Sequence, residues 1–367
     1  MNRTEFNEAL RRKLDGIAEA DRKSILDYYN ECIDDRMDDG ASEEEAIDAL
    51  GSLDELAAAV LADAPVTGLI PRVTPEESRS RRVSRKDAQV IEPGFRGLDV
   101  ELANCDLRLA LSEDRECRVA YDGSARFGLP EVAVRGDRLV IRNDPMGVKW
   151  RDRITGWLED SGERRVTVFL PAADYDTLRV HLDSGDCRLE AGLRFGTADL
   201  RSRSGDVACA AEFRDTLHIE TTSGDVTLGS LFCKGELTVQ SSSGDLNAAV
   251  VRCGRLRANT ASGDLEIREL GCDRAEIRTV SGDLQVENAA VSGDLRVQTV
   301  SGDLSLNCRN AGSVSLTTVS GDIEARFAQR MQFAVSTVSG EVHVPASDPS
   351  GTPCSVRSVS GDICVRS

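Results

Sequence analysis

The sequence predicts a mainly β protein, a parallel β-solenoid preceded by a small α-helical bundle. A Ser-Gly-Asp triplet recurs every 19 to 21 residues from residue 184 onward, which is typical of stacked repeats. Apolar and polar residues alternate on either side of each triplet, which indicates half-buried strands. Residues 4–62 instead carry apolar side chains three and four positions apart, which indicates helices. The triplets begin at Ser184, Ser204, Ser223, Ser243, Ser262, Ser281, Ser301, Ser320, Ser339 and Ser360, and the one at Ser339 ends in Glu.

Residues 1–63 are expected to form a helical domain. The apolar face of its first helix is made of Phe6, Leu10, Leu14 and Ile17. A second helix is expected from the N-cap Asp21 to Gly40. Ser42 and Ser52 each begin a Ser-x-x-Glu capping box that opens a further short helix. Four short helices with one apolar stripe each predict a small bundle.

Residues 64–97 are expected to be a flexible basic linker, because they contain several prolines and no sustained hydrophobic period. The strongly basic run of the chain lies here, at Arg79, Arg81, Arg82, Arg85 and Lys86. One interpretation is weak binding to anionic lipid, at about 1 kcal/mol per basic residue near the surface. The other is a solvated linker that also lies against the acidic head. At most, peripheral contact with an anionic membrane is expected.

Residues 98–367 are expected to form the solenoid. In each repeat a strand, a Ser-Gly-Asp corner, a second strand and a return turn make one coil, and neighbouring coils stack about 4.8 Å apart. Gly permits the backbone conformation of the corner, and Ser and Asp oxygens accept hydrogen bonds from corner amides. Residues 181–367 hold the regular repeats. Residues 98–180 read as degenerate strands that cap the N-terminal end, with Asn104-Cys105-Asp106 where a triplet would stand.

Stacked coils place the acidic residues of the triplets in one column. The column comprises Asp186, Asp206, Asp225, Asp245, Asp264, Asp283, Asp303, Asp322, Glu341 and Asp362. Because like charges at this spacing repel, each must be hydrogen-bonded at its corner, paired with Arg, well solvated or bridged by a cation. Calcium is the alternative to a purely structural role, and its ligands would be Asp225, Asp245, Asp264, Asp283, Asp303 and Asp322.

The same reasoning stacks Cys233, Cys253 and Cys272, which all lie eight residues after the Asp. The coil spacing is within disulfide reach. Three thiols can also bind a soft metal, but no Cys-x-x-Cys or Cys/His partner accompanies them. A buried thiol also packs as a small apolar group, and core filling is the favoured interpretation. No cofactor is therefore expected.

The residue before the triplet Ser divides the repeats into two groups. It is Asp183, Arg203, Thr222, Ser242 and Ala261 in the first five, then Val280, Val300, Val319, Val338 and Val359 in the last five. A position that accepts Asp and Arg points outward, so the valines are predicted to form an exposed apolar stripe that binds a partner. The competing interpretation is a local change of strand parity that buries them.

The chain stops at Ser360-Gly361-Asp362-Ile363-Cys364-Val365-Arg366-Ser367 without a polar terminal strand or a helix. An open coil end invites edge pairing. Self-association through the C-terminal end of the solenoid is therefore expected.

Composition argues against several classes of partner. A formal net charge of −18 disfavours nucleic acid, because phosphate binding needs a basic footprint. No stretch reaches the roughly 18–20 apolar residues of a transmembrane helix. Arg3, Glu5 and Glu8 stand where a signal peptide has its apolar core, so a cytoplasmic location is expected.

Catalytic signatures are also missing from the sequence. The acids repeat uniformly, His181, His218 and His343 are scattered, and aromatic residues make up only 4% of the chain. Polysaccharide chemistry needs a distinctive acid/base pair and stacking aromatics. A non-catalytic binding or scaffold protein is expected. The alternatives are a carbohydrate-active β-helix enzyme and an exported adhesin.

Two segments resemble known families. TEFNEALRRKLDGI, DRKSILDYYNECIDD and EEEAIDALGSLDELA resemble the HAAS signalling domain of bacterial membrane-associated proteins, which is associated with PadR-type regulators. TVSGDL, TTSGDV and VTVFLPAADYDTLRVHLDSGD resemble a bacterial putative-adhesin family with a β-strand repeat. The resemblance implies a non-enzymatic solenoid linked with cell-envelope stress and antimicrobial-peptide responses. It also implies a helical head that docks a protein regulator or partner.

Overall fold

The structure is a computed structural model that describes residues 3–13, 26, 30, 33, 42–43, 47, 89–92, 94–123, 130–143 and 164–366. The chain divides into two compact units. One comprises Met1–Arg81, Ser124–Phe127 and Met146–Gly162, and the other comprises Arg82–Gly123, Gly128–Pro145 and Glu163–Ser367.

The first unit contains helix α1, Arg3–Lys13, which buries Phe6 and Leu10 as the sequence predicts. Glu5 lies in its first turn and three basic residues lie in its last turn, an order that complements the helix dipole. The amide of Arg3 donates to Glu43 Oε1 at 2.8 Å. Most of the other expected helices, and the linker with Arg79, Arg81, Arg82, Arg85 and Lys86, lie outside the described residues.

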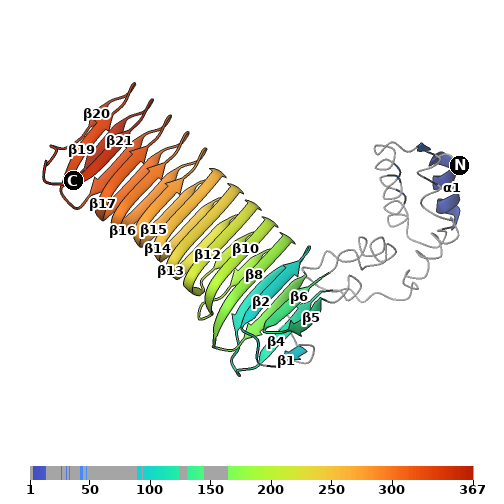
Figure 1. Ribbon diagram of the computed structural model, residues 1–367. Helices are drawn as coiled ribbons and strands as arrows, with labels where there is room; N and C mark the ends of the chain where they lie inside the picture. Colours follow the sequence, from blue (N-terminus) through green and yellow to red (C-terminus); the bar gives the residue numbers. More distant parts are fainter. Residues whose placement is uncertain are drawn as a thin grey trace, which may run out of the picture. The chain divides into compact units, whose positions relative to one another are not determined.

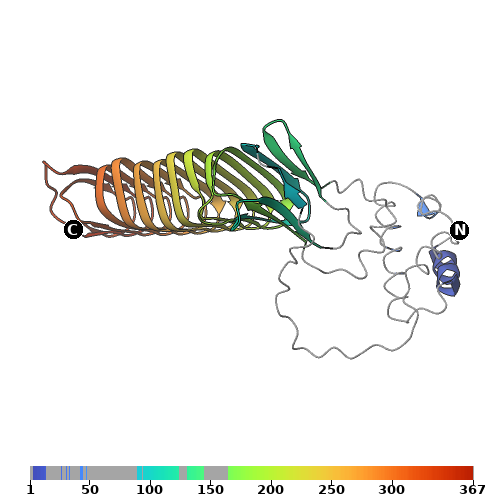
Figure 2. The same cartoon turned by 90° about the horizontal axis from the view of Figure 1, so that it is seen from below.

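The second unit is a β-solenoid of about ten turns, which confirms the predicted fold class. Its regular strands are β8 Asp174–Ser184, β9 Cys187–Leu189, β10 Arg194–Ser204, β11 Val207–Cys209, β12 Glu212–Ser223, β13 Val226–Ser243, β14 Leu246–Ser262, β15 Leu265–Arg278, β16 Leu284–Gln298 and β17 Leu304–Thr317. Each pairs in parallel with the equivalent strand of the next coil, and Figure 1 shows the coils stacked side by side. Figure 2 shows the same stack from below.

Inward and outward side chains alternate along each strand, and the inward ones form one continuous core. In β13 the inward residues Val226, Leu228, Leu231 and Cys233 are at most 1% exposed, whereas the residues between them face outward. Each inward side chain packs against its equivalents in the coils on both sides, which excludes water along the whole axis.

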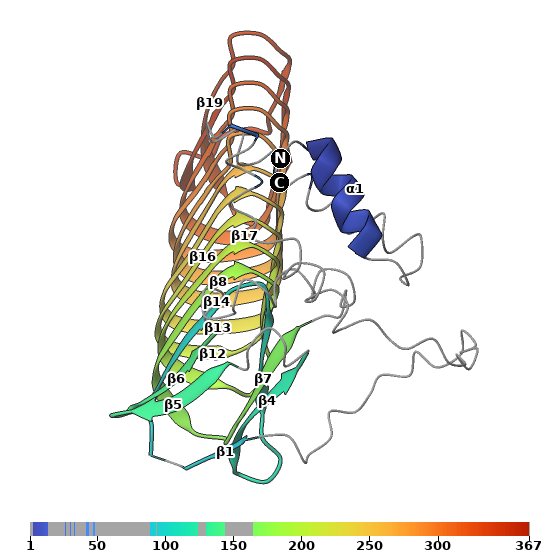
Figure 3. The ribbon, with the colours of Figure 1, turned by 90° about the vertical axis from the view of Figure 1, so that its right-hand side faces the viewer.

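The N-terminal end of the solenoid is closed by irregular strands. They are β1 Gln89–Ile91, β2 Gly97–Leu102, β3 Asp106–Leu111, β4 Cys117–Asp122, β5 Glu131–Arg135, β6 Arg138–Arg142 and β7 Arg165–Leu170. The coil of β2 and β3 lies between the β6–β7 coil and the β8–β9 coil. Beyond the β6–β7 coil, β5 pairs with β6 and β4 pairs with β7, both in antiparallel fashion. Figure 3 shows these strands gathered at one end of the stack.

The C-terminal end is also built out of sequence order. Its strands are β18 Ile323–Phe327, β19 Met331–Ser336, β20 Val342–His343, β21 Thr352–Arg357 and β22 Ile363–Arg366. Strand β21 pairs with β17 on one side and β19 on the other, and β22 pairs with β18 and β20. The last strands of the chain therefore fill an internal slot, and the coil of β19 and β20 is the outer one.

This order corrects one premise of the sequence analysis. The segment Ser360–Arg366 is not the open end, because its strand is paired along both edges. The outer coil is also partly capped. Ser347 Oγ accepts the amide of Phe333 at 2.9 Å, and the amide of Asp348 donates to the Met331 carbonyl oxygen at 3.0 Å.

Candidate recognition face

The corner of every repeat requires glycine for two reasons. The triplet glycines have φ between +121° and +145°, a conformation that side chains of L-residues rarely adopt. A Cβ atom at any of them would also lie 2.1 to 2.4 Å from a carbonyl oxygen of the neighbouring coil. The corner therefore stacks only because its glycines let adjacent backbones approach closely. Asn104, at φ 53°, begins the degenerate corner that stacks beneath Ser184-Gly185-Asp186.

The predicted column of carboxylates is present, and backbone amides satisfy it. The amide of each triplet acid donates to Oδ1 of the Asp in the adjoining coil, as from Asp225 to Asp206 and from Asp283 to Asp264, at 2.8 Å each. At the C-terminal end the order is Asp322, Asp362, Glu341, because the last strands are inserted. Hydrogen bonding at the corner is thus one way in which the structure relieves the repulsion.

Calcium binding by this column stays a prediction. Asp245, Asp264, Asp303 and Asp322 share the geometry of Asp225 and Asp283, each with one oxygen bound to an amide. Within the residues that the structure describes, no group of three or more His, Cys, Asp or Glu side chains is arranged to hold a metal ion.

The valine column is exposed. Val280, Val300, Val319, Val359 and Val338 are exposed by 52%, 47%, 45%, 48% and 84%, in their order along the stack. Backbone hydrogen bonds fix that order, for example from the Ser301 amide to the Val280 oxygen and from the Ser360 amide to the Val319 oxygen, both at 2.9 Å. The interpretation that buried these side chains is wrong. We call these five residues the valine stripe.

A column of buried hydroxyls behind the corner was missed. It lies two residues before the triplet Ser, at Ser202, Thr221, Thr260, Thr279, Thr299, Thr318 and Ser358, all at most 7% exposed. Thr260 Oγ1 donates to the Ser262 carbonyl oxygen at 3.1 Å. The sequence contains a pattern that predicts this column. A Ser or Thr stands two residues before most triplets, in phase with the inward Leu and Ile residues.

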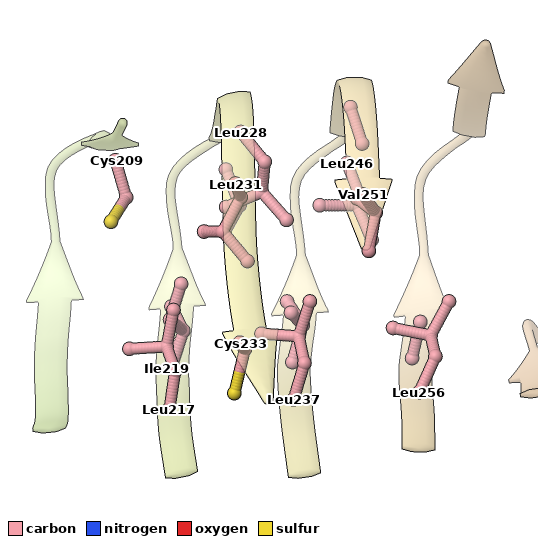
Figure 4. Close-up of a cluster of buried hydrophobic side chains, with 14 of the residues drawn as sticks. Cys209, Leu217, Ile219, Leu228, Leu231, Cys233, Leu237, Leu246, Val251 and Leu256 are labelled. Atoms are coloured by element: carbon pink, nitrogen blue, oxygen red, sulfur yellow. The ribbon is translucent and has the colours of Figure 1, made fainter. Parts of the chain in front are cut away.

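The three cysteines stack as predicted, since Cys233 pairs in register with Cys253 and Cys253 with Cys272. They continue a ladder of rings in which Phe195 and Phe213 lie 6.1 Å apart. Figure 4 shows Cys233 among buried leucines. A hydrogen bond with Cys272 and burial raise the pKa of Cys253, and burial raises that of Cys233. Core filling accounts for Cys233, which is 1% exposed.

A groove of about 800 Å³ runs along the return turns of several coils. Its wall includes Phe232, which is 43% exposed, and the ion pair between Arg252 and Glu269 at 2.9 Å. Cys253 lies on its floor and is half-buried. The groove combines one exposed ring, charges of both signs and a reachable thiol.

The histidines do not converge. His181, His218 and His343 belong to different coils, and each lies near one carboxylate, at 3.9, 3.7 and 3.3 Å. No helix among the described residues is long and apolar enough to span a membrane.

A family model described as Toastrack DUF4097 matches residues 95–366. The chain belongs to this family. A HAAS model matches residues 5–59, the segment that resembles HAAS in sequence. No curated protein matches the chain.

Several solved structures are similar to the Toastrack chain. A putative adhesin from Bacteroides fragilis is 15% identical, covers 78% of this chain and 99% of its own, and has a TM-score of 0.35. A putative lipid binding protein from Parabacteroides distasonis is 13% identical, with 75% and 95% covered and a TM-score of 0.38. A putative cell adhesion protein from Clostridium sporogenes is 9% identical, with 76% and 97% covered and a TM-score of 0.23.

Proposed function

We propose that this Toastrack protein is a non-catalytic scaffold in cell-envelope stress signalling. Its HAAS head docks a regulator, and its solenoid presents the valine stripe to a second protein. The exposure of that stripe is the observation that carries the proposal. Five apolar side chains in one column on a surface of a strongly acidic protein are unusual, and such stripes mark contact surfaces.

The stripe is held rigidly, which suits recognition. Each valine precedes a corner whose Ser amide and acidic-residue amide donate to the adjoining coil; the acidic residue is Glu341 after Val338 and Asp in the others. The side chains are β-branched and therefore lose little rotamer freedom when a partner covers them. A partner that binds here loses less conformational entropy than one that binds a mobile loop.

A non-catalytic role is supported by how the carboxylates and histidines of the solenoid are bonded and spaced. In the described solenoid the triplet carboxylates accept backbone amides, and the histidines lie on separate coils. General acid/base catalysis needs titratable groups that converge on one substrate. Such convergence is not a feature of the recognition face.

The proposal is tested by affinity capture with the full chain as bait, from cells with and without envelope stress. The stripe variant is Val300→Thr with Val319→Thr. The matched control is Val134→Thr, because Val134 is 45% exposed but lies on β5, away from the stripe. A protein retained by the wild type and the control but lost by the stripe variant supports the proposal. Equal capture by all three baits overturns it.

Docking by the head is tested with a charge exchange on α1, Glu8→Arg with Arg12→Glu. Both side chains are exposed, and the exchange keeps the net charge. We expect the regulator to be lost while the stripe partner is retained. Retention of every partner would remove the head from the proposal.

Self-association remains part of the proposal, with the surface moved to the outer coil of β19 and β20. Val338 there is 84% exposed, whereas the equivalent Val319 of an inner coil is 45% exposed, so a second copy has apolar area to cover. Light scattering coupled to size exclusion tests it. A monomer at all micromolar concentrations would count against it.

Lipid contact through Arg79, Arg81, Arg82, Arg85 and Lys86, and the cytoplasmic location, remain predictions. Sedimentation with anionic vesicles at low and high salt tests the first, because surface charge attraction is screened by salt. Absence of binding at low salt removes the lipid contact.

A further inference from the structure

Cys253 and Cys272 form a thiol pair beside the groove. They are register partners on β14 and β15, and the groove is lined by Cys253 together with Gly271 and Asp273, the neighbours of Cys272. Cys253 is half-buried and Cys272 is 8% exposed.

Cys233 also lines the groove and is the other register partner of Cys253, but it is only 1% exposed. Its Sγ lies within hydrogen-bond distance of two carbonyl oxygens, that of Asp215 at 3.6 Å and that of Glu236 at 3.4 Å, either of which can accept its one S–H. Three thiols in one column also cannot share a single ion, since the first and third are about 9.6 Å apart at a coil spacing of about 4.8 Å. The chemistry available is therefore that of two thiols.

The coil spacing is compatible with both a disulfide and a metal. Register partners in parallel strands lie about 4.8 Å apart, which falls within the Cα separation of about 4.4–6.8 Å found in disulfides. Both thiols are free in this structure. Two metal–thiolate bonds of about 2.3 Å in a line span about 4.6 Å, close to the coil spacing.

We propose that Cys253 and Cys272 form a two-coordinate site for a soft cation of the copper(I) type. Thiolate ligands select soft ions, and the described surroundings offer no cluster that would complete a tetrahedral zinc site. When the ion binds, two S–H bonds break, two S–metal bonds form and two protons leave to solvent. No electron is transferred, and no co-reactant is needed.

The other described cysteines provide the contrast. Cys364 is also half-buried, but its register partners are Glu324 and His343. Cys308 and Cys354 are buried, with Ala289 and Val314 among their register partners. Cys187 and Cys209 are also buried, and neither lines the groove. The proposal therefore assigns copper(I) to the pair beside the groove, and Cys364 is the matched control.

The test is a competition titration of the reduced full chain, without oxygen, against copper(I) bicinchoninate. We expect the wild type to remove one equivalent of copper from the chelator, and Cys364→Ser to do the same. Cys253→Ser and Cys272→Ser should each lose this uptake while keeping the far-ultraviolet circular dichroism of the wild type. X-ray absorption of the copper-loaded wild type should show two sulfur ligands.

The proposal is overturned if either single variant takes up copper like the wild type, or if Cys364→Ser loses uptake equally. If a serine variant unfolds, Cys253→Ala replaces it, because alanine leaves no polar group in the core. A reduced wild type that takes up no copper, and whose Cys253 and Cys272 peptides become joined in air with a mass two hydrogens lower, would assign the pair to a disulfide instead.

Discussion

The two ends of the solenoid are built by the same device and closed in different ways. At the N-terminal end the coil of β2 and β3 lies one place inside the stack, and at the C-terminal end the coil of β21 and β22 does. The first and last coils in chain order, β2–β3 and β21–β22, are therefore paired along both edges, which protects them from fraying. Beyond them, antiparallel β4 and β5 close the first end, but one parallel coil forms the second.

The two ends differ in how completely the strand ladder is closed. At the N-terminal side, antiparallel strands and a hairpin end the ladder. At the C-terminal side Ser347 and Asp348 bond the outer edge of β19 only at Phe333 and Met331. The rest of that coil, with exposed Val338 and Val342, continues the valine stripe toward solvent. Val338, at 84%, is the most exposed large apolar side chain in the described part of the chain, whereas Val90 and Val134 at the N-terminal end are 59% and 45% exposed.

Removal of residues 352–367 should have the largest effect. Strand β19 pairs with β21 and β20 pairs with β22, so the deletion takes away those ladder partners of the outer coil. The deleted strands also bury Cys354, Val356, Ile363 and Val365, each at most 5% exposed, and burial of a Val or Ile contributes roughly 1.5–3 kcal/mol. Hydrogen exchange should show loss of protection over residues 331–343.

The opposite outcome is equally informative. If amides 331–343 stay protected in the deletion, the outer coil has moved inward to pair directly with β17 and β18. That result would show that the tail acts as a spacer, and it would contradict the expected dependence of the outer coil on the inserted strands.

Alanine at a corner glycine should distinguish inner coils from the outer one. At Gly302, with φ +143°, the new Cβ would lie 2.1 Å from the Gly282 carbonyl oxygen. Coils on both sides prevent relaxation, so Gly302→Ala should lower the free energy of unfolding by about 3 kcal/mol or more. Gly340→Ala has a similar clash at 2.2 Å, but its coil is free to shift outward and the cost should be smaller.

Urea denaturation measures both variants, with Gly271→Ala as control, because its Cβ would meet only Arg252 Cγ at 3.8 Å. If Gly302→Ala and Gly340→Ala lower the free energy of unfolding equally, the outer coil is held as firmly as the inner ones.

The hydroxyl column offers a smaller contrast. Thr318 is 1% exposed, and its Oγ1 has no hydrogen-bond partner among the described residues, whereas Thr337 Oγ1 in the outer coil donates to Ser339 O at 3.1 Å. Thr318→Val should raise the free energy of unfolding by about 1 kcal/mol, because it removes an unpaired buried polar group. Thr337→Val should lower it or leave it unchanged. Thermal melts compare the two, and a destabilised Thr318→Val would reveal a bound water or other partner.

The sequence predicts much of this structure because the repeat imposes local rules. The period places the acids and the three cysteines in columns, and the triplet glycine is required wherever the corner recurs. The alternation of inward and outward side chains along the strand also predicts that Thr221 faces inward. The parity of Val280 was ambiguous, because the strand bends at the corner and alternation alone does not follow the chain around it.

Coil order could not be predicted from the repeat. The segments around Ser320, Ser339 and Ser360 carry nearly the same pattern, so each fits any slot of the stack. Only the longer interval between Ser339 and Ser360, with Pro345 and Pro349, sets the last repeat apart. The repeat predicts that Cys253 and Cys272 stack, but it does not predict the groove or the exposure of Cys253, because both depend on how neighbouring return turns pack.

The valine stripe should show the smallest effect on stability and the clearest effect on binding. Val300 and Val319 are about half exposed, and surface substitutions usually change stability by no more than about 0.5 kcal/mol. The double variant Val300→Thr with Val319→Thr should therefore melt like the wild type and like Val134→Thr at the other end of the solenoid. Loss of partner capture without loss of stability assigns the C-terminal face to recognition. Loss of stability with capture intact would instead mean that these valines serve packing, and the two ends would then differ in architecture alone.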